Sequence, residues 1–403
     1  MKLNQRNRKK FLQLTSLASA SLLVPRFLYG LNNGRLFSES NQQKKLVVIQ
    51  LSGGNDGLNT FIPYSNDLYY ESRMGLSYPK SEIILLDDSI GLNPNMKAFE
   101  SIFKDGECCI INQVGYPNPD RSHFRSMDIW NTASGSDQYF NTGWLGRYLD
   151  AYCINEDKAH VAVEIDDLLS LALKGEKVKG LAMRNPEKLF TAIKDPYLDA
   201  LINVPFDESS DAADYMYKTL RETSHSAGYI HKYSKIYKSN ESYPDHDMGK
   251  RLQIIGELIC SGCESQIYYV SITGFDTHAN QKPAQGRLLG ILSECLKSFS
   301  NDLKRNNKFD ETLILCFSEF GRRVDQNASQ GTDHGAANNV ILVGGGLKKK
   351  GFFNDPPKLN NLLNGDLSYE LDFRSIYATI LDKWLGADAD KVIGKKFQQL
   401  DFI

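Results

Sequence analysis

The sequence predicts an α/β fold with a mostly parallel central sheet. Several short, nearly continuous apolar runs end in glycine-containing turns, which is the pattern of strands buried on both faces. Two of these runs, 266–273 and 312–317, flank a stretch whose apolar residues recur every three or four positions. This order of strand, helix and strand indicates a parallel pair with a right-handed crossover. At 403 residues, the chain is long enough for one large domain with insertions.

The N-terminal part of the chain supplies two strands and a helix. The first strand, Leu46–Leu51, runs into the loop Ser-Gly-Gly-Asn-Asp-Gly at 52–57. The second, Cys108–Gly115, leads into a proline-rich turn, after which a helix is predicted over Ser122–Trp130. Open α/β sheets bind ligands at the carboxyl ends of their strands, so the polar residues after both strands are candidates for a site.

The middle of the chain is harder to interpret. Residues 150–248 combine mixed charges, several aromatic side chains and a polar run, and we interpret them as a largely helical insertion or cap. Four histidines of this stretch are expected at the surface: His160, His225, His231 and His246.

The C-terminal part completes the predicted sheet. The helix between its first two strands has an apolar face formed by Leu288, Leu289, Leu292, Cys295, Leu296, Phe299 and Leu303. A further strand is predicted over Val340–Val343, ahead of three glycines. The last helix is predicted to begin after Asp372, because aspartate favours the N-cap position.

The N-terminus has the features of an export signal. Residues 1–30 contain six basic residues and no acidic one, and the apolar run Leu14–Val24 is short for crossing a bilayer. The order Arg8-Lys9-Lys10-Phe11-Leu12 resembles a twin-arginine signal with lysine as its second basic residue. An ordinary secretory signal and a basic cytosolic tail are the alternatives. We predict a signal at 1–30, a linker at 31–45 and a domain at 46–403, in the periplasm or at the cell surface, without a transmembrane span in the mature protein.

Charge and cysteine content exclude some classes of protein. Without the six basic residues of the leader, 41 basic residues remain against 49 acidic ones, a net charge of about −8. Nucleic acid is therefore not expected as a partner. The seven cysteines lack the dense spacing of a disulfide-stabilised secreted domain. Cys260 and Cys263 form a CxxC pair, for which packing is favoured over a disulfide, a redox role or a zinc site.

Five polar clusters adjoin the predicted strands. They are Asn55, Asp56 and Asn59; Arg121, Ser122 and His123; Asp276 and His278; Glu319 and Arg322; and Asp333 and His334. The first four follow a strand, and the fifth precedes the last strand. Because parallel strands end at the same edge of a sheet, we expect these side chains to gather in one cleft.

The gathered residue types suit a divalent metal ion, with zinc, manganese or calcium as the candidates. The predicted metal ligands are Asp56, His123, Asp276, His278, Glu319, Asp333 and His334. Ser122 at a helix start is the candidate nucleophile. Arg121 or Arg322 would hold the oxyanion of an ester, and Glu319 would act as a further ligand or as a base.

Several of these residues have a structural alternative. Asp56 can shape the turn before Gly57, and Ser122 can cap its helix. Glu319 can pair with a neighbouring arginine. The metal-site interpretation is favoured for the remaining pairs, Asp276 with His278 and Asp333 with His334.

Six motifs in order resemble the domain-of-unknown-function 1501 family. They are Leu-Ser-Gly-Gly-Asn-Asp-Gly-Leu-Asn at 51–59, Pro-Asn-Pro-Asp-Arg-Ser-His-Phe at 117–124, Gly-Trp-Leu-Gly-Arg at 143–147, Gly-Phe-Asp-Thr-His-Ala-Asn-Gln at 274–281, Ser-Glu-Phe-Gly-Arg-Arg at 318–323 and Gly-Thr-Asp-His-Gly at 331–335. This family resembles alkaline phosphatases, sulfatases and cofactor-independent phosphoglycerate mutases. The resemblance implies a three-layer αβα sandwich and export by the twin-arginine machinery.

The same resemblance suggests roles for single residues. Asp56, Asp276, His278 and His334 match metal ligands of that superfamily, and Ser122 stands in the place of its nucleophile. The chain departs from the superfamily at Glu319-Phe320, where an Asp-His pair is usual, so one imidazole of a two-metal set is missing. Aligning Arg121 with the sulfatase motif puts Pro117 at the nucleophile, which argues against a formylglycine sulfatase. One ion, a rearranged pair using His123 or Asp333, and no catalysis all remain open.

Residues and resemblance together predict a metal-dependent hydrolase of phosphate or sulfate esters, acting outside the cytoplasm on a small molecule or a glycan. The alternative is a non-catalytic surface protein that keeps the fold and binds a glycan, a metal or a partner protein. The survival of polar clusters at the strand ends favours the hydrolase, and the missing imidazole favours the alternative.

Overall fold

The computed structural model describes residues 44–153, 159–202 and 211–403, so the predicted export signal lies outside the described residues. Its centre is a nine-stranded sheet in the order β11-β5-β10-β9-β1-β8-β6-β7, with β14 also paired to β5. In chain order, the strands of this sheet are β1 (Lys45–Ser52), β5 (Cys108–Gly115), β6 (Ala162–Glu164), β7 (Leu181–Ala182), β8 (Ile267–Thr273), β9 (Thr312–Phe317), β10 (Asn338–Val343), β11 (Gly351–Phe352) and β14 (Leu371–Asp372).

All strands of the sheet run in one direction except β10. That strand is antiparallel to both of its neighbours, β5 and β9, whereas β1 pairs in parallel with β8 and β9. The predicted α/β class with a mostly parallel sheet is therefore confirmed. Because β10 is reversed, the loop that precedes it lies at the same edge as the loops that follow β1, β5, β8 and β9.

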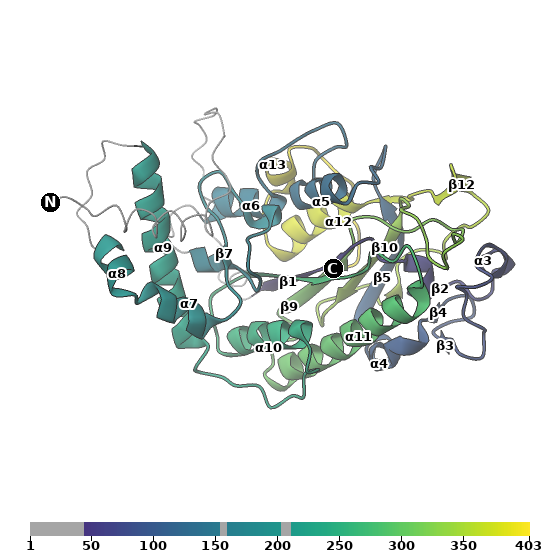
Figure 1. Cartoon of the computed structure of the whole chain (residues 1–403), viewed down its shortest axis with the longest axis horizontal. Coiled ribbons are helices and arrows are strands. Elements are labelled where there is room, and N and C mark those ends of the chain that lie inside the picture. The colour runs from purple at the N-terminus through teal and green to yellow at the C-terminus, as the bar shows by residue number, and fades with distance from the viewer. Residues whose placement is uncertain (1–43, 154–158, 203–210) are drawn as a thin grey trace. The chain divides into compact units, whose positions relative to one another are not determined.

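Helices cover both faces of the sheet (Figure 1). One face packs against α5 (His123–Thr132), α6 (Trp144–Tyr152), α12 (Phe373–Thr379) and α13 (Ala389–Ile393), and the other against α4 (Lys97–Lys104), α10 (Asp247–Cys260) and α11 (Gln281–Arg305). Successive strand residues point to opposite faces, so Val48 and Cys109 join the first core while Val47 and Cys108 join the second. The result is the three-layer arrangement expected from the sequence.

Several predicted elements match the structure closely. The strands predicted at 108–115 and 312–317 coincide with β5 and β9. Helix α12 begins directly after Asp372, whose side chain accepts a hydrogen bond from the Arg374 amide, and it continues into a π-helical turn at Ile380–Trp384. These elements were predictable because apolar runs and capping residues are local signals.

The stretch 150–248 contains more of the sheet than its composition suggests. It holds helices α7 (Pro186–Ile193), α8 (Pro196–Ile202) and α9 (Asp211–Tyr233), but also the edge strands β6 and β7. Strands of two or three residues are too short to show an alternating pattern. The surface prediction is wrong for His160, which is 5% exposed, with its Nδ1 3.2 Å from Ser226 Oγ.

The remaining small elements lie outside the main sheet. Helix α3 (Asp67–Ser72) follows β2 (Phe61–Ile62), which pairs with β4 (Gly91–Leu92) and through it with β3 (Ile84–Leu85). A hairpin is formed by β12 (Leu362–Leu363) and β13 (Asp366–Leu367). All seven cysteines are free thiols. Within the described ranges, none of the helices has the length and apolarity that a membrane span requires.

Candidate metal centre

Three side chains from three segments meet at the carboxyl edge of the sheet. His123 is the first residue of α5 after β5, Asp276 follows β8, and His334 precedes the reversed strand β10. Each of the three offers a ligand atom, and these atoms all lie within 4.8 Å of one another. Asp276 Oδ1 is 3.4 Å from His123 Nε2 and 3.3 Å from His334 Nε2. The reversal of β10 is what brings His334 to this edge.

Hydrogen bonds at the far side of each ring fix which nitrogen faces the centre. The Nδ1 of His334 lies 2.7 Å from the carbonyl oxygen of Arg121, which can only accept, so this nitrogen carries the proton. The Nδ1 of His123 lies 2.9 Å from a carboxylate oxygen of Glu319 and donates in the same way. In the neutral form, both rings therefore direct the lone pair of Nε2 at Asp276.

His278 lies beside this group of three. Its Nε2 is 3.0 Å from Asp276 Oδ1 and 2.9 Å from His334 Nε2. Its Nδ1 lies 3.4 Å from Asp333 Oδ1, which also accepts from Asn327. The side chains of His278 and Asp333 are 44% and 57% exposed, against 24% for His123. His278 is therefore the imidazole most open to solvent, and Asp333 contacts the centre through it.

Two buried charged residues lie directly behind the centre. Glu319 is fully buried and accepts from His123 and from the backbone amide of Gly53. Arg322 donates to Asp276 Oδ1 at 2.8 Å, and its other N–H groups donate to carbonyl oxygens of Gly54, Thr332, Gly53 and Phe275. Arg322 therefore fixes the position of the Asp276 carboxylate. Its guanidinium is buried and is not available to bind a substrate.

The pKa values of the centre reflect these contacts. Burial favours a higher pKa for Asp276, but the hydrogen bond and positive charge of Arg322 outweigh it and lower its pKa to about 2. The hydrogen bond to Glu319 raises the pKa of His123. Burial lowers the pKa of His334, which keeps its imidazole neutral. An ionised carboxylate and a neutral imidazole are the forms that bind metal ions.

The structure places Asp56 apart from the centre. Its side chain is 1% exposed and accepts from the Arg73 guanidinium, the Gln281 amide and the backbone amide of Leu58. The Arg73 guanidinium is also buried, and it donates in addition to Asn59 and to the carbonyl oxygen of Val324. The carboxylate of Asp56 is therefore fully engaged without an ion. No local pattern in the sequence indicates that Arg73 is the partner of Asp56.

The remaining predicted residues lie at the rim. The side chain of Arg121 is 44% exposed and pairs with the buried carboxylate of Asp366. Ser122 is exposed at the N-cap position of α5 and makes no side-chain capping hydrogen bond. Its hydroxyl is thus not used by the helix end that carries His123.

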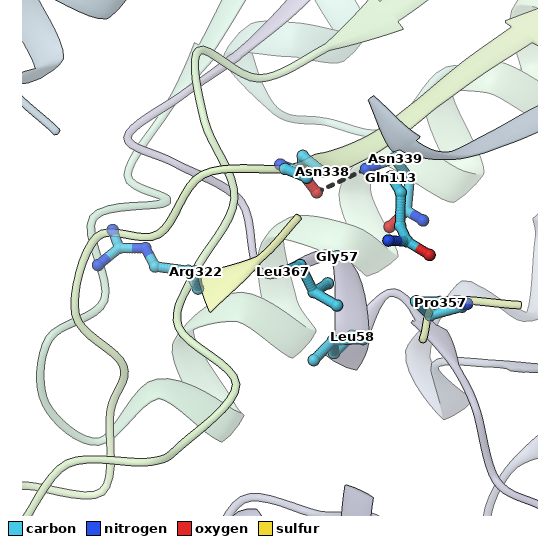
Figure 2. Close-up of a pocket in the computed structure, with 9 residues that line it drawn as sticks. Gly57, Leu58, Gln113, Arg322, Asn338, Asn339, Pro357 and Leu367 are labelled. Carbon is cyan, nitrogen blue, oxygen red and sulfur yellow. Dashed lines mark hydrogen bonds between the residues drawn. The ribbon is translucent and has the colours of Figure 1, made fainter. Parts of the chain in front are cut away.

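A small cavity beside the centre has a different character (Figure 2). It encloses about 10 Å³, the space of one water molecule. Its lining consists of Gly57, Leu58, Gln113, Arg322, Ala337, Asn338, Asn339, Pro357 and Leu367. Asn338 donates to backbone oxygens of Asn55 and Phe320, and Asn339 donates to Asn112 Oδ1, while among the described residues the buried Oδ1 of Asn339 has no hydrogen-bond partner. This cavity therefore offers packing space and no catalytic group.

The donor set fits a divalent metal ion. Among the described residues, the buried Nε2 of His123 has no hydrogen-bond partner, although its lone pair faces Asp276. A tetrahedral ion with 2.0–2.1 Å bonds holds its ligand atoms about 3.3 Å apart. Two of the three separations, those between Asp276 and the imidazoles, are 3.3 and 3.4 Å, and all three lie within 4.8 Å. Three ligands, one carboxylate and two imidazoles, leave a position open, as in catalytic zinc sites.

The fold and this centre define an α/β protein with a candidate metal site at the carboxyl edge of its sheet. The chain belongs to the family described as protein of unknown function (DUF1501), which matches residues 109–398. The family assignment made from the sequence motifs is therefore confirmed.

Solved structures show a more distant similarity. The phosphonate monoester hydrolase of Silicibacter pomeroyi is 9% identical, covers 89% of this chain and 78% of its own, and has a TM-score of 0.41. The lipoteichoic acid synthase of Listeria monocytogenes is 9% identical over 90% of this chain and 75% of its own, at 0.39. An alkaline phosphatase superfamily protein of Vibrio parahaemolyticus is 11% identical over 87% and 69%, at 0.36. No curated protein matches the chain. The argument for a site therefore rests on the residues of this chain.

Proposed function

We propose that the protein is a hydrolase of phosphate or sulfate esters that depends on one divalent metal ion. One observation carries the proposal: the Nε2 atoms of His123 and His334 face the ionised carboxylate of Asp276, while both Nδ1 atoms are bound to oxygen acceptors. His278 would complete the coordination or stand beside the ion. When bound, the ion would polarise an ester oxygen or activate water.

Ser122 is the proposed nucleophile. It is exposed, adjoins His123 in sequence, and lies at the start of α5, where the helix dipole favours negative charge. Attack of its hydroxyl oxygen on phosphorus or sulfur would form a seryl ester and expel the alcohol, which takes up the serine proton. Water would then hydrolyse the seryl ester and release phosphate or sulfate.

We also propose that the protein acts outside the cytoplasm, in the periplasm or at the cell surface. The basic leader with its short apolar run supports this location. The ester would be carried by a small molecule or a glycan.

A second candidate function is metal or ligand binding without catalysis, at a cell surface. It is favoured by the absence of a free guanidinium around the described centre, because Arg322 is buried and Arg121 is paired with Asp366. Many ester hydrolases use such a group to hold the oxyanion.

Elemental analysis of the purified mature protein, together with a panel of chromogenic phosphate and sulfate esters, tests the two functions. The hydrolase predicts about one ion per chain and turnover that disappears in His334→Ala and Ser122→Ala. Bound metal without turnover on any ester favours the binding protein. Protein that stays free of metal after incubation with zinc, manganese or calcium contradicts the hydrolase and favours binding of a ligand without a metal.

A further inference from the structure

Glu319 lies directly behind His123, on the side away from the centre. We infer that Glu319 is a positioning residue, which holds the His123 imidazole in the tautomer and orientation that the metal ion needs without contacting the ion itself. The inference rests on the proposed function, because it assigns a role within that metal centre.

Polar groups of the protein lie within hydrogen-bond distance of both carboxylate oxygens of Glu319. Oε1 accepts from His123 Nδ1 at 2.9 Å and from the Gly53 amide at 2.8 Å, which uses both of its lone pairs. Oε2 lies 3.2 Å from the Ser318 hydroxyl, which donates its proton to the Leu51 carbonyl oxygen at 2.6 Å. The side chain is 0% exposed. A carboxylate engaged in this way binds the far nitrogen of a metal-ligating imidazole, an arrangement common around metal centres.

The backbone of Gly53 makes this contact possible. Gly53 has a φ of +118°, and a Cβ there would lie 2.4 Å from the Asp276 backbone nitrogen. Only glycine allows this close approach, through which the Gly53 amide reaches Glu319. The end of β9, the start of α5 and the loop after β1 are thereby joined at one carboxylate.

Within the part of the chain that the structure describes, the charge of Glu319 has no arginine or lysine partner. Among the described residues, its ion-pair partner is His123. A buried carboxylate is costly without a compensating cation, so a purely structural role would be better served by a neutral side chain. An ion bound at His123 would supply positive charge on the other side of the ring. Glu319 is therefore placed to increase the affinity of the centre for a cation.

The affinity of the full mature chain for Zn²⁺, measured by competition with a chromophoric chelator, tests the inference. Glu319→Gln is expected to weaken Zn²⁺ binding about 10- to 100-fold, the usual effect of removing such a partner. The matched control is Glu164→Gln, which makes the same change at another buried carboxylate, one that accepts from the Ser170 amide, and is expected to keep the wild-type affinity. If Glu319→Gln does not fold, Glu319→Asp keeps the charge but shortens the reach, and the same loss is expected.

A double-mutant cycle separates positioning from direct ligation. If Glu319 acts through His123, Glu319→Gln has almost no further effect on Zn²⁺ affinity in a His123→Ala background. Full additivity of the two losses would show that Glu319 binds the ion independently and would overturn the inference. So would wild-type affinity in Glu319→Gln.

The outcomes also distinguish this inference from the proposed function. If the wild type binds Zn²⁺ but hydrolyses no ester, the hydrolase proposal is contradicted. The comparison of Zn²⁺ affinity between the wild type and Glu319→Gln still tests the positioning role. Turnover and metal binding that both survive in Glu319→Gln remove the positioning role and leave the hydrolase. A wild-type chain that binds none of Zn²⁺, Mn²⁺ and Ca²⁺ contradicts both.

Discussion

The carboxylates that follow the adjacent strands β1 and β8 have opposite surroundings. Asp56, after β1, is buried against the guanidinium of Arg73 and the amide of Gln281. Asp276, after β8, has a side chain that is 48% exposed and lies next to imidazole nitrogens. Both residues are predicted metal ligands from the sequence, but their partners differ. Each carboxylate contacts a buried guanidinium, Arg73 at Asp56 and Arg322 at Asp276. Asp276 in addition lies next to imidazole nitrogens on its exposed side, and their lone pairs leave a place for a cation.

A third carboxylate extends this comparison. Glu164, at the end of β6, is 3% exposed, and its side chain accepts a hydrogen bond from the Ser170 amide. Among the described residues, no hydrogen bond or ion pair joins Glu164 to an arginine or a histidine, and burial raises its pKa to about 8. The edge of one sheet thus holds a buried carboxylate paired with arginine, a half-exposed one that contacts both arginine and imidazoles at a candidate metal site, and a buried one that is mostly protonated at neutral pH.

The largest effect is expected for Arg73→Ala. Removing one partner of a buried ion pair leaves the Asp56 charge uncompensated, which costs about 3–5 kcal/mol in the free energy of unfolding. Urea denaturation measures the loss, and Zn²⁺ affinity of the folded protein should stay close to that of the wild type. A loss of less than about 1 kcal/mol would mean that the pair behaves like an exposed one.

His334→Ala should lower the affinity for Zn²⁺ and leave stability nearly unchanged, the reverse of what is expected for Arg73→Ala. We expect the affinity for Zn²⁺ to fall at least about 100-fold, because a direct ligand matters more than an outer partner. The stability of the metal-free protein should change little. His225→Ala, at an exposed position of α9, is the control and should retain full affinity. Equal affinities of both variants would place the ion elsewhere.

Glu164→Gln should alter the pH dependence of stability. Because the pKa of Glu164 is raised from 4.5 to about 8 on folding, the folded state holds a proton that the unfolded state has lost. The free energy of unfolding should therefore fall as the pH rises from 4.5 to about 8. The variant lacks this group and should gain about 1–3 kcal/mol over the wild type at pH 8 and little at pH 5. Thermal unfolding at both pH values gives the difference, and an equal change at both would contradict the assignment.

The smallest effect is expected for Asp333→Asn. The carboxylate and His278 are both substantially exposed and 3.4 Å apart, and such pairs contribute little in water. Zn²⁺ affinity should fall less than about threefold. A loss as large as that of Glu319→Gln would show that Asp333 is as important to the centre as the buried carboxylate.

Parts of the centre were predictable and parts were not. The position of Asp276 and His278 after a strand, and of His334 before one, follows from apolar runs and turns in the sequence. The different surroundings of Asp56 and Asp276 cannot be predicted from the sequence, because both are acidic residues in glycine-containing loops after central strands. Arginine is usually exposed, so the sequence does not indicate that Arg73 is buried against Asp56. Only the contacts in the structure show this pair.

The sequence by itself determined the α/β class, the main strands and helices, and the edge of the sheet where polar side chains gather, because apolar periodicity and capping act over a few neighbouring residues. Only the tertiary structure decided which side chains meet there. Arg73 is held by the carbonyl oxygen of Val324, 251 positions away, and Glu319 reaches His123 across 196 positions. It also decided the reversal of β10, which brings His334 to the metal centre. Such partners depend on how distant strands are ordered in the sheet, and local sequence patterns do not encode that order.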